Sequence, residues 1–306
     1  MSRPAALVLR NPAAGRAADA RALALARHAI AARFEADEGD LDANGGWRAT
    51  VASALAIGPR IFVAAGGDGT VHALLEALVD GHGNVPLEAV TLGVAALGSS
   101  NDFVKPLRPG DGLVPLRLDA ARATPRDLVR VRMVDSSGRE RSTLLAVSAS
   151  AGVVAEGNAL FDAGRWPGRG TAVAIAASAL RAIGRHRDFT ARLRHDGTEE
   201  EISLSSLSVL KSPWLSGSLR YDLPVAPADG LLGVALCAGM GRLRLVSTLA
   251  GLLFGRFRNR PGTRSFLTTA LVLSADEPFL LEVDGEVSPA LEAHFAILPE
   301  RVRVCA

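Results

Sequence analysis

The chain has 306 residues, of which 48% are hydrophobic and 22% charged, and its formal net charge is +2. This composition is typical of a globular protein with a sizeable core and excludes an intrinsically disordered chain. The near-neutral charge balance predicts no strong electrostatic partner, and so no nucleic acid partner. The sequence contains no uncharged apolar run of roughly 18 or more residues, which excludes a membrane-spanning helix.

Cysteine and lysine are both scarce. The two cysteines, Cys237 and Cys305, are too few for a disulfide framework or a zinc site, and we expect a cytoplasmic protein. Lys105 and Lys211 are the only lysines, so arginine supplies nearly all of the basic charge. The scarcity of lysine carries no function by itself.

The first 120 or so residues alternate short apolar runs with helical patterns. The apolar runs predict buried strands at 5–9, 61–65 and 89–95. An Ala/Arg-rich helix is expected over about 17–33, and an amphipathic helix is expected to begin near Thr70. Strands and helices that alternate in this way predict a parallel sheet with helices on its faces.

A polar or glycine-rich turn follows each of these three strands. The turns are Asn11–Arg16, Gly66–Thr70 and Leu97–Asp102. Because ligands of open parallel sheets bind at the carboxyl ends of the strands, we expect the three turns to converge on one crevice.

After residue 123 the pattern changes to alternating apolar and polar residues, which predicts antiparallel strands with one packed face. Helices are expected near 170–183 and 241–257. Short strands are expected to close the chain at 266–273, 279–283, 293–298 and 301–305. We therefore predict an α/β domain at 1–123 and a β-rich, sandwich-like domain at 124–294. The prediction leaves open a return of the C-terminal strands, about 295–306, to the first domain.

The turn Gly66-Gly67-Asp68-Gly69-Thr70 has the composition of an anion-binding loop. Glycines let the backbone approach a phosphate, and the N-terminus of the following helix supplies free N–H groups. The alternative is a tight turn capped by Asp68 and Thr70. A Gly-Lys-Ser/Thr loop is excluded because neither lysine follows such glycines, and His72 replaces the third glycine of the dinucleotide fingerprint.

Several motifs, taken together in this order, carry a family resemblance. They are Asn11-Pro12-x-x-Gly15-Arg16, the Gly66–Thr70 turn, Leu97-Gly98-Ser99-Ser100-Asn101-Asp102-Phe103, Ala228-Asp229-Gly230-Leu231-Leu232, Leu281-Glu282-Val283-Asp284-Gly285-Glu286 and Leu298-Pro299-x-x-Val302-x-Val304. The chain resembles the diacylglycerol kinase catalytic domain family of bacterial lipid kinases and sphingosine kinases, which is related to NAD kinases. The resemblance covers nearly the whole chain.

The resemblance implies that the first domain binds ATP. The implied ATP-contacting residues are Asn11, Gly15, Arg16, Gly66, Gly67, Asp68, Gly69, Thr70, Ser99, Asn101 and Asp102. It further implies an NAD kinase-like first domain and a lipid-acceptor role for the second.

The resemblance also implies a carboxylate base, which matches Asp284, with Glu286 beside it. In an extended segment residues i and i+2 share a face, so both carboxylates are expected to point the same way. The alternative is a Val-Asp-Gly-Glu hairpin turn, since Asp-Gly is a strong turn signal. Asp68 is the rival base or metal ligand, and the sequence leaves the choice open.

A structural magnesium site in the second domain is implied at Asp229 and the carbonyl groups of Ala226 and Leu231. Two departures from the family pattern lie near it. The segment from Lys211 to Ser218 stands where the family has Asn-Gly and a run of glycines, and Ala228 replaces an acidic residue.

We therefore expect ATP- and Mg²⁺-dependent phosphorylation of a lipid hydroxyl, with diacylglycerol or a related lipid alcohol as acceptor. The alternatives are a kinase for a soluble metabolite or nucleotide, and a non-catalytic nucleotide-binding protein. The arginines around 241–257 predict either a basic helix on an anionic membrane surface or a helix that covers the sheet. The first reading places the enzyme peripherally at the inner membrane face. A homodimer is left open.

Overall fold

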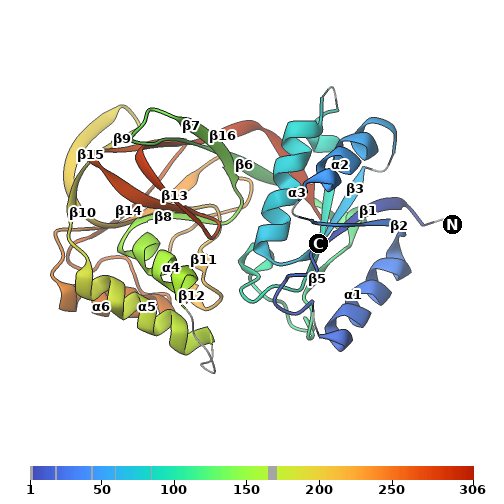
Figure 1. Ribbon diagram of the computed structural model, residues 1–306, viewed down its shortest axis with the longest axis horizontal. Coiled ribbons are helices and arrows are strands. Elements are labelled where there is room, and N and C mark those ends of the chain that lie inside the picture. Colours follow the sequence, from blue (N-terminus) through green and yellow to red (C-terminus); the bar gives the residue numbers. More distant parts are fainter. Residues whose placement is uncertain (1–2, 18, 43, 59, 84, 165–170) are drawn as a thin grey trace. The chain divides into compact units, whose positions relative to one another are not determined.

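The computed structural model describes residues 3–17, 19–42, 44–58, 60–83, 85–164 and 171–306 (Figure 1). The chain divides into two compact units. Unit 1 comprises Met1–Leu128 and Leu298–Ala306, and unit 2 comprises Val129–Ile297. The division at 128 lies five residues beyond the expected one at 123. Two strands, β6 (Thr124–Val134) and β16 (Glu286–Val304), run from one unit into the other.

Unit 1 is built on a parallel sheet with the strand order β2–β1–β3–β4. The end of β16 pairs in parallel with β4, and β5 pairs with β4 in the antiparallel direction. The strands of this sheet are β1 (Ala5–Arg10), β2 (Glu35–Asp40), β3 (Ile61–Gly66), β4 (Thr91–Ala96) and β5 (Leu116–Arg117).

Helices cover both faces of the unit 1 sheet (Figure 1). Ala22, Ala26 and Ile30 of α1 pack against the face that carries Val8 and Val63. On the other face, α2 and α3 lie side by side. The helices and 3-10 turns of unit 1 are α1 (Ala20–Arg33), α2 (Gly46–Ile57), α3 (Asp68–Gly81), η1 (Leu87–Ala89), η2 (Asp102–Val104) and η3 (Ala120–Arg122).

Two elements of unit 1 have no clear signal in the sequence. Strand β2 reads Glu-Ala-Asp-Glu-Gly-Asp and is exposed, so it lacks the apolar pattern of a strand. It forms because it pairs with β1 at the edge of the sheet, where Arg10 binds both Glu38 and Asp40 at 2.8 Å. Helix α2 buries only Trp47, Val51 and Leu55.

Unit 2 is a β-rich unit whose strands pair in the antiparallel direction. The order β14–β13–β10–β8–β15–β16 is completed by β9, which pairs with both β10 and β15, and by β7, which pairs with β6. Its remaining strands are β7 (Glu140–Leu145), β8 (Ser148–Gly152), β9 (Phe189–His195), β10 (Thr198–Leu210), β11 (Trp214–Leu215), β12 (Leu219–Arg220), β13 (Leu232–Ala238), β14 (Thr263–Thr268) and β15 (Ala270–Val283).

The C-terminal strands are longer than expected. The predicted strands at 279–283 and 293–298 are parts of β15 and β16, which together form one long hairpin. The predicted break between 273 and 279 falls where β15 changes register between Ser274 and Phe279, whereas the break predicted between 298 and 301 lies inside β16, which is continuous. The fold class expected from the sequence, a parallel α/β part followed by an antiparallel β-rich part, is confirmed.

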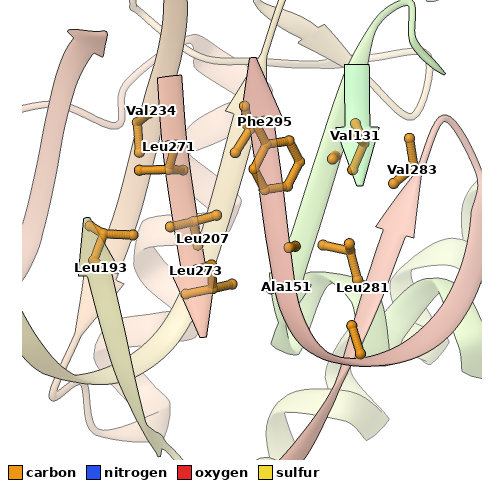
Figure 2. Packing of buried hydrophobic residues seen from close by; sticks show 14 of the residues in the cluster. Val131, Ala151, Leu193, Leu207, Val234, Leu271, Leu273, Leu281, Val283 and Phe295 are labelled. Carbon is orange, nitrogen blue, oxygen red and sulfur yellow. The ribbon is translucent and has the colours of Figure 1, made fainter. Parts of the chain in front are cut away.

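The core of unit 2 lies on one face of its strands (Figure 2). Alternate residues of each strand supply it, as the period of two in a strand requires. Leu281 and Val283 of β15, Leu207 of β10 and Phe295 of β16 all belong to this cluster, and each is at most 3% exposed.

Three helices cover a second apolar cluster of unit 2, which is centred on Tyr221, Phe257 and Leu245. These are α4 (Val153–Ala163), α5 (Thr171–Arg185) and α6 (Arg242–Gly251), the last followed by η4 (Leu252–Phe254). The sequence predicted α5 and α6 but not α4, and residue 170 of the predicted 170–183 helix lies outside the described residues. Among the described helices, none combines the length and hydropathy required to cross a membrane.

Replacing Leu207 by alanine tests the unit 2 core. Leu207 has 0% exposure, so Leu207→Ala is expected to lower the free energy of unfolding by about 3 kcal/mol. Urea unfolding measures this loss. Leu243→Ala is the matched control, because Leu243 is 88% exposed and its loss is expected to change stability by less than about 0.5 kcal/mol. Equal losses for the two variants would contradict this assignment of the core.

Candidate functional site

The three polar turns of unit 1 lie next to one another because the strands that precede them are in register. Arg10 of β1 pairs with Ala65 of β3, and Gly66 pairs with Ala96 of β4. The first residues after β1 and β4 continue the hydrogen-bond ladder of the parallel sheet. Asn11 N–H donates to the Ala65 carbonyl at 3.1 Å, and Leu97 N–H donates to the Gly66 carbonyl at 2.8 Å. The expected convergence of these turns is thus present within unit 1.

The Gly66–Thr70 turn passes directly into α3, which begins at Asp68 with Gly67 as its N-cap. The helix therefore starts two residues before the predicted position. A side chain at Gly66 would place its Cβ 2.1 Å from the hydroxyl of Thr70, so only glycine fits there. The buried Thr70 hydroxyl also accepts a hydrogen bond from the Asn11 amide at 3.1 Å, which ties the first turn to this one.

Glycines bring the backbones of the second and third turns into direct contact. A Cβ on Gly98 would lie 2.5 Å from the Cα of Gly67 and 2.8 Å from the Asn101 amide oxygen. The first turn reaches the third as well, because Arg16 N–H donates to the Leu97 carbonyl at 2.8 Å. The guanidinium of Arg16 also binds the carbonyl of Leu113 at 2.6 Å. The three turns therefore pack together at the N-terminus of α3, where the positive end of the helix dipole favours an anion.

The carboxylate of Asp68 holds the second and third turns together. Its Oδ2 accepts the N–H of Asp102 at 3.0 Å, and its Oδ1 accepts the N–H of Phe103 at 2.9 Å. A carboxylate pointing at a bound phosphate would repel it. Here the negative charge of Asp68 is directed at the first N–H groups of the 3-10 turn η2.

Asn101 and Asp102 shape the third turn. Asn101 adopts a left-handed conformation with φ of 52°, and its side chain spans the turn by accepting from Gly98 N–H at 2.9 Å and donating to the Gly98 carbonyl at 3.0 Å. The buried carboxylate of Asp102 binds Lys105 at 2.6 Å. Ser99 lies against the first turn, with its backbone nitrogen 3.6 Å from a Cβ built on Gly15.

In unit 2, Asp284 and Gly285 form the two-residue turn of the β15–β16 hairpin, with φ angles of 48° and 98°. Val283 and Glu286 are the flanking pair of the ladder. The hairpin alternative from the sequence is therefore present. The expectation that Asp284 and Glu286 share a face of an extended segment is wrong, since one lies in the turn and the other begins the next strand. Glu286 is exposed.

The carboxylate of Asp284 is held by three consecutive backbone N–H groups. Ala146 donates to Oδ2 at 2.6 Å, and Val147 and Ser148 donate to Oδ1 at 2.9 and 3.0 Å. Asp284 N–H in turn donates to the Ser148 carbonyl at 2.9 Å. Sequence analysis missed this cradle, because backbone donors leave no residue signature.

The residues expected to hold a structural magnesium ion bind an ammonium group instead. Lys211 Nζ donates to Asp229 Oδ1 and to the Leu231 carbonyl, each at 2.8 Å. The N–H of Ala226 donates to Asp229 Oδ2 at 3.2 Å. Magnesium needs about six oxygen ligands at roughly 2.0–2.1 Å. With an ammonium already bonded to two of the expected ligands, these residues do not fit the ion.

Two family models match the chain, one in its N-terminal part and one in its C-terminal part. Residues 5–131 match the family model of the diacylglycerol kinase catalytic domain, and residues 147–306 match that of the YegS C-terminal NAD kinase beta sandwich-like domain. The chain is 28% identical over 269 residues to a "probable lipid kinase YegS-like" protein of Stenotrophomonas maltophilia, with 83% of this chain and 81% of the relative covered. A protein of the same description from Pseudomonas aeruginosa is 36% identical over 117 residues, which covers 36% of this chain and 35% of that protein.

Solved structures share the fold at low sequence identity. One is a diacylglycerol kinase from Bacillus anthracis, with a TM-score of 0.65 and 15% identity over 100% of this chain and 97% of that one. Another is yeast NADH kinase complexed with NADH, with a TM-score of 0.52 and 11% identity over 100% of this chain and 84% of that one. At these identities the likeness shows the fold alone.

Replacing Gly98 by alanine tests the contact between the second and third turns. Because the added Cβ lies 2.5 Å from the Gly67 backbone, the turns must separate, and we expect Gly98→Ala to weaken ATP binding at least about tenfold. Isothermal titration with ATP measures the change. Gly112→Ala is the control, since nothing lies within 4 Å of its Cβ. ATP binding that is equal in the two variants would contradict a role of this contact in nucleotide binding.

Proposed function

The chain belongs to the lipid kinase-like family that combines a diacylglycerol kinase catalytic domain with a YegS C-terminal domain, and on this premise we propose that it transfers the γ-phosphoryl group of ATP to a lipid hydroxyl. Family membership makes it a kinase-type phosphotransferase. Diacylglycerol or a related lipid alcohol is the proposed acceptor.

The observation that carries the proposal is the junction of three turns at the N-terminus of α3. Phosphoryl transfer asks a protein mainly for positioning of the phosphates and for neutralisation of their charge. The closely packed Gly67 and Gly98 backbones and the N–H groups at the start of α3 supply a cradle of this kind. Magnesium supplies charge neutralisation when it is bound to the phosphates, as it commonly is in kinases.

The two acidic residues of the unit 1 site have distinct proposed roles. Asp68 positions the turns, because both of its oxygens accept backbone N–H groups. Asp102 is paired with Lys105 and keeps that ammonium within the third turn. Backbone N–H groups hold the Asp284 carboxylate as well, so the choice of base rests on the family motif that Asp284 matches and not on these contacts.

Asp284 is proposed to accept the proton of the acceptor hydroxyl. Three backbone N–H groups fix the orientation of its carboxylate, and a fixed orientation is what a general base requires. The exposed Glu286, two residues on, is proposed to contribute negative charge beside it.

A lipid acceptor is supported by an apolar surface on unit 2. Leu243 on α6 is 88% exposed, and Leu253 and Phe254 of η4 are 58% and 74% exposed. Helix α5, which contacts α6, adds Val173 and Leu180 with 57% and 59% exposure. Exposed arginines lie close to these residues in the sequence, namely Arg181, Arg185, Arg187, Arg242, Arg244, Arg256 and Arg258. Exposed apolar side chains with basic sequence neighbours suit an anionic membrane surface, and we propose a peripheral location there.

The fold likeness to yeast NADH kinase supports a second candidate, a soluble hydroxylated metabolite or nucleotide as acceptor. Labelled ATP incubated with a total lipid extract, and separately with a soluble metabolite extract, tells the two apart by the fraction that becomes labelled. ATP binding without transfer to either extract would favour the non-catalytic alternative and contradict the proposal.

Replacing Asp284 by asparagine tests the proposed base. Removal of a general base is expected to lower kcat about 100-fold or more while ATP binding is retained. Labelled phosphate in the lipid fraction measures the rate, and a melting curve reports the folded fraction. Asp276→Asn is the matched control, because Asp276 lies in β15, the strand that leads to Asp284, and has an 81% exposed side chain. Activity that falls only in proportion to the folded fraction would give Asp284 a structural role alone.

Replacing exposed apolar side chains of α6 and η4 by acidic residues tests the proposed membrane surface. Burial of a leucine or phenylalanine contributes about 1.5–3 kcal/mol, so Leu243→Glu with Phe254→Glu is expected to weaken vesicle binding more than tenfold. Co-sedimentation with vesicles of phosphatidylglycerol and phosphatidylethanolamine measures binding. Ile57→Glu, at a 90% exposed site of unit 1, serves as control. If both variants sediment like the wild type, this surface is not the contact.

A further inference from the structure

Lys211 is a fully buried ammonium group in unit 2. Its side chain has 0% exposure, and it follows directly on strand β10. Its Nζ donates to Asp229 Oδ1 and to the Leu231 carbonyl, each at 2.8 Å. A buried charge is tolerated only where partners of this kind compensate it, so the pairing of Lys211 with Asp229 is obligatory for this packing.

Position 211 carries a lysine, although arginine supplies nearly all of the basic charge of this chain. The chain has 34 basic residues, and only Lys105 and Lys211 among them are lysines. An arginine carries a wide planar group with five N–H donors, whereas an ammonium is a compact point charge. A compact cation is what a carboxylate and a carbonyl on one tight loop can surround. Lys211 therefore has the size and the charge to stand where an ion would.

Asp229 organises the loop between β12 and β13 around this cation. Its Oδ1 also accepts the N–H of Leu231 at 3.0 Å, and its Oδ2 accepts the N–H of Ala226 at 3.2 Å. The carboxylate thus accepts hydrogen bonds from the Lys211 ammonium and from the N–H groups of Leu231 and Ala226, and the pair with Lys211 is electrically neutral.

We infer that the Lys211 ammonium replaces a bound divalent cation in unit 2, so that the 226–231 loop keeps its conformation without metal. The neutral pair leaves no net negative charge to attract magnesium, and two of the oxygens that would ligate it are occupied. Of the two departures from the family pattern noted in the sequence, the one at Lys211 is thereby explained.

The backbone of Lys211 is hydrogen-bonded to the 146–148 segment, whose N–H groups hold the Asp284 carboxylate. The N–H groups of Lys211 and Ser212 both donate to the Val147 carbonyl, at 2.9 and 3.1 Å. Val147 N–H donates in turn to Asp284 Oδ1 at 2.9 Å. The Lys211 ammonium anchors this backbone to the 226–231 loop, and through that backbone Lys211 is a positioning residue for the carboxylate proposed as base. This extension rests on the proposed function, whereas the replacement of the metal does not.

Thermal melting of the nucleotide-free protein tests the replacement directly. Wild-type protein is expected to melt at the same temperature in EDTA and in millimolar MgCl₂, because only a ligand that binds the native state shifts the midpoint. Lys211→Ala removes the ammonium and leaves space beside Asp229. Its melting temperature is expected to fall, and added MgCl₂ is expected to raise it again in part. A wild-type midpoint that rises in MgCl₂, or a Lys211→Ala midpoint equal to that of wild type, would overturn the inference.

A double-variant cycle separates the charge pair from simple packing. Lys211→Met keeps the volume but leaves Asp229 buried without its cation, so its melting temperature is expected to fall. Lys211→Met combined with Asp229→Asn removes both charges and is expected to regain at least about half of that loss. Losses that simply add would contradict an internal ion pair.

Kinetics test the link to Asp284. At constant MgATP, wild-type activity is expected to be independent of free Mg²⁺, whereas Lys211→Ala is expected to show a lowered kcat, unchanged KM for ATP and partial rescue as free Mg²⁺ rises. A purely structural lysine would show no such rescue, and that result would overturn the positioning role. Lack of phosphotransfer by the wild type would instead count against the proposed function and leave the melting result standing.

Discussion

Both oxygens of the Asp68 carboxylate accept backbone N–H groups from the turn after β4, and the geometry of the unit 1 site depends on this clamp. The parallel register brings the three turns to one edge of the sheet, but it does not fix the distance between their backbones. Asp68 does so, and glycine at 67 and 98 permits the close approach. The loop that resembles a phosphate cradle thus uses its one carboxylate for structure, which removes the conflict between Asp68 and a bound phosphate.

The same device recurs in unit 2. Asp284 binds three consecutive backbone N–H groups of the 146–148 segment, and Asp229 binds two N–H groups together with the Lys211 ammonium. In each case a short acidic side chain fixes a turn that glycine makes possible, at Gly285 and Gly230 with positive φ. A carboxylate held this firmly costs little further ordering when a substrate binds, so the binding energy remains available for the chemical step.

The sequence predicts those features of the fold that local residue patterns determine. Period-two and helical spacing identified many of the strands and helices, though not β2, α2 or α4, and glycine-rich turns after strands identified the converging edge. The partners of Asp68 lie 34 and 35 positions away, and the Asp284 cradle lies 136 to 138 positions away, so no local pattern reports them. Asp229 and Leu231 were expected to ligate magnesium, but both bind the Lys211 ammonium instead. A family resemblance indicates which positions correspond. It does not indicate what those residues contact when a neighbouring residue differs from the family pattern.

The turns after β1, β3 and β4 are proposed to form one nucleotide site, and amide hydrogen exchange of the intact protein with and without MgATP tests this. If they form one site, ATP slows exchange together in 11–16, 66–71 and 97–103, with one apparent affinity for all three segments. Protection confined to one turn, or found only in unit 2, would contradict it.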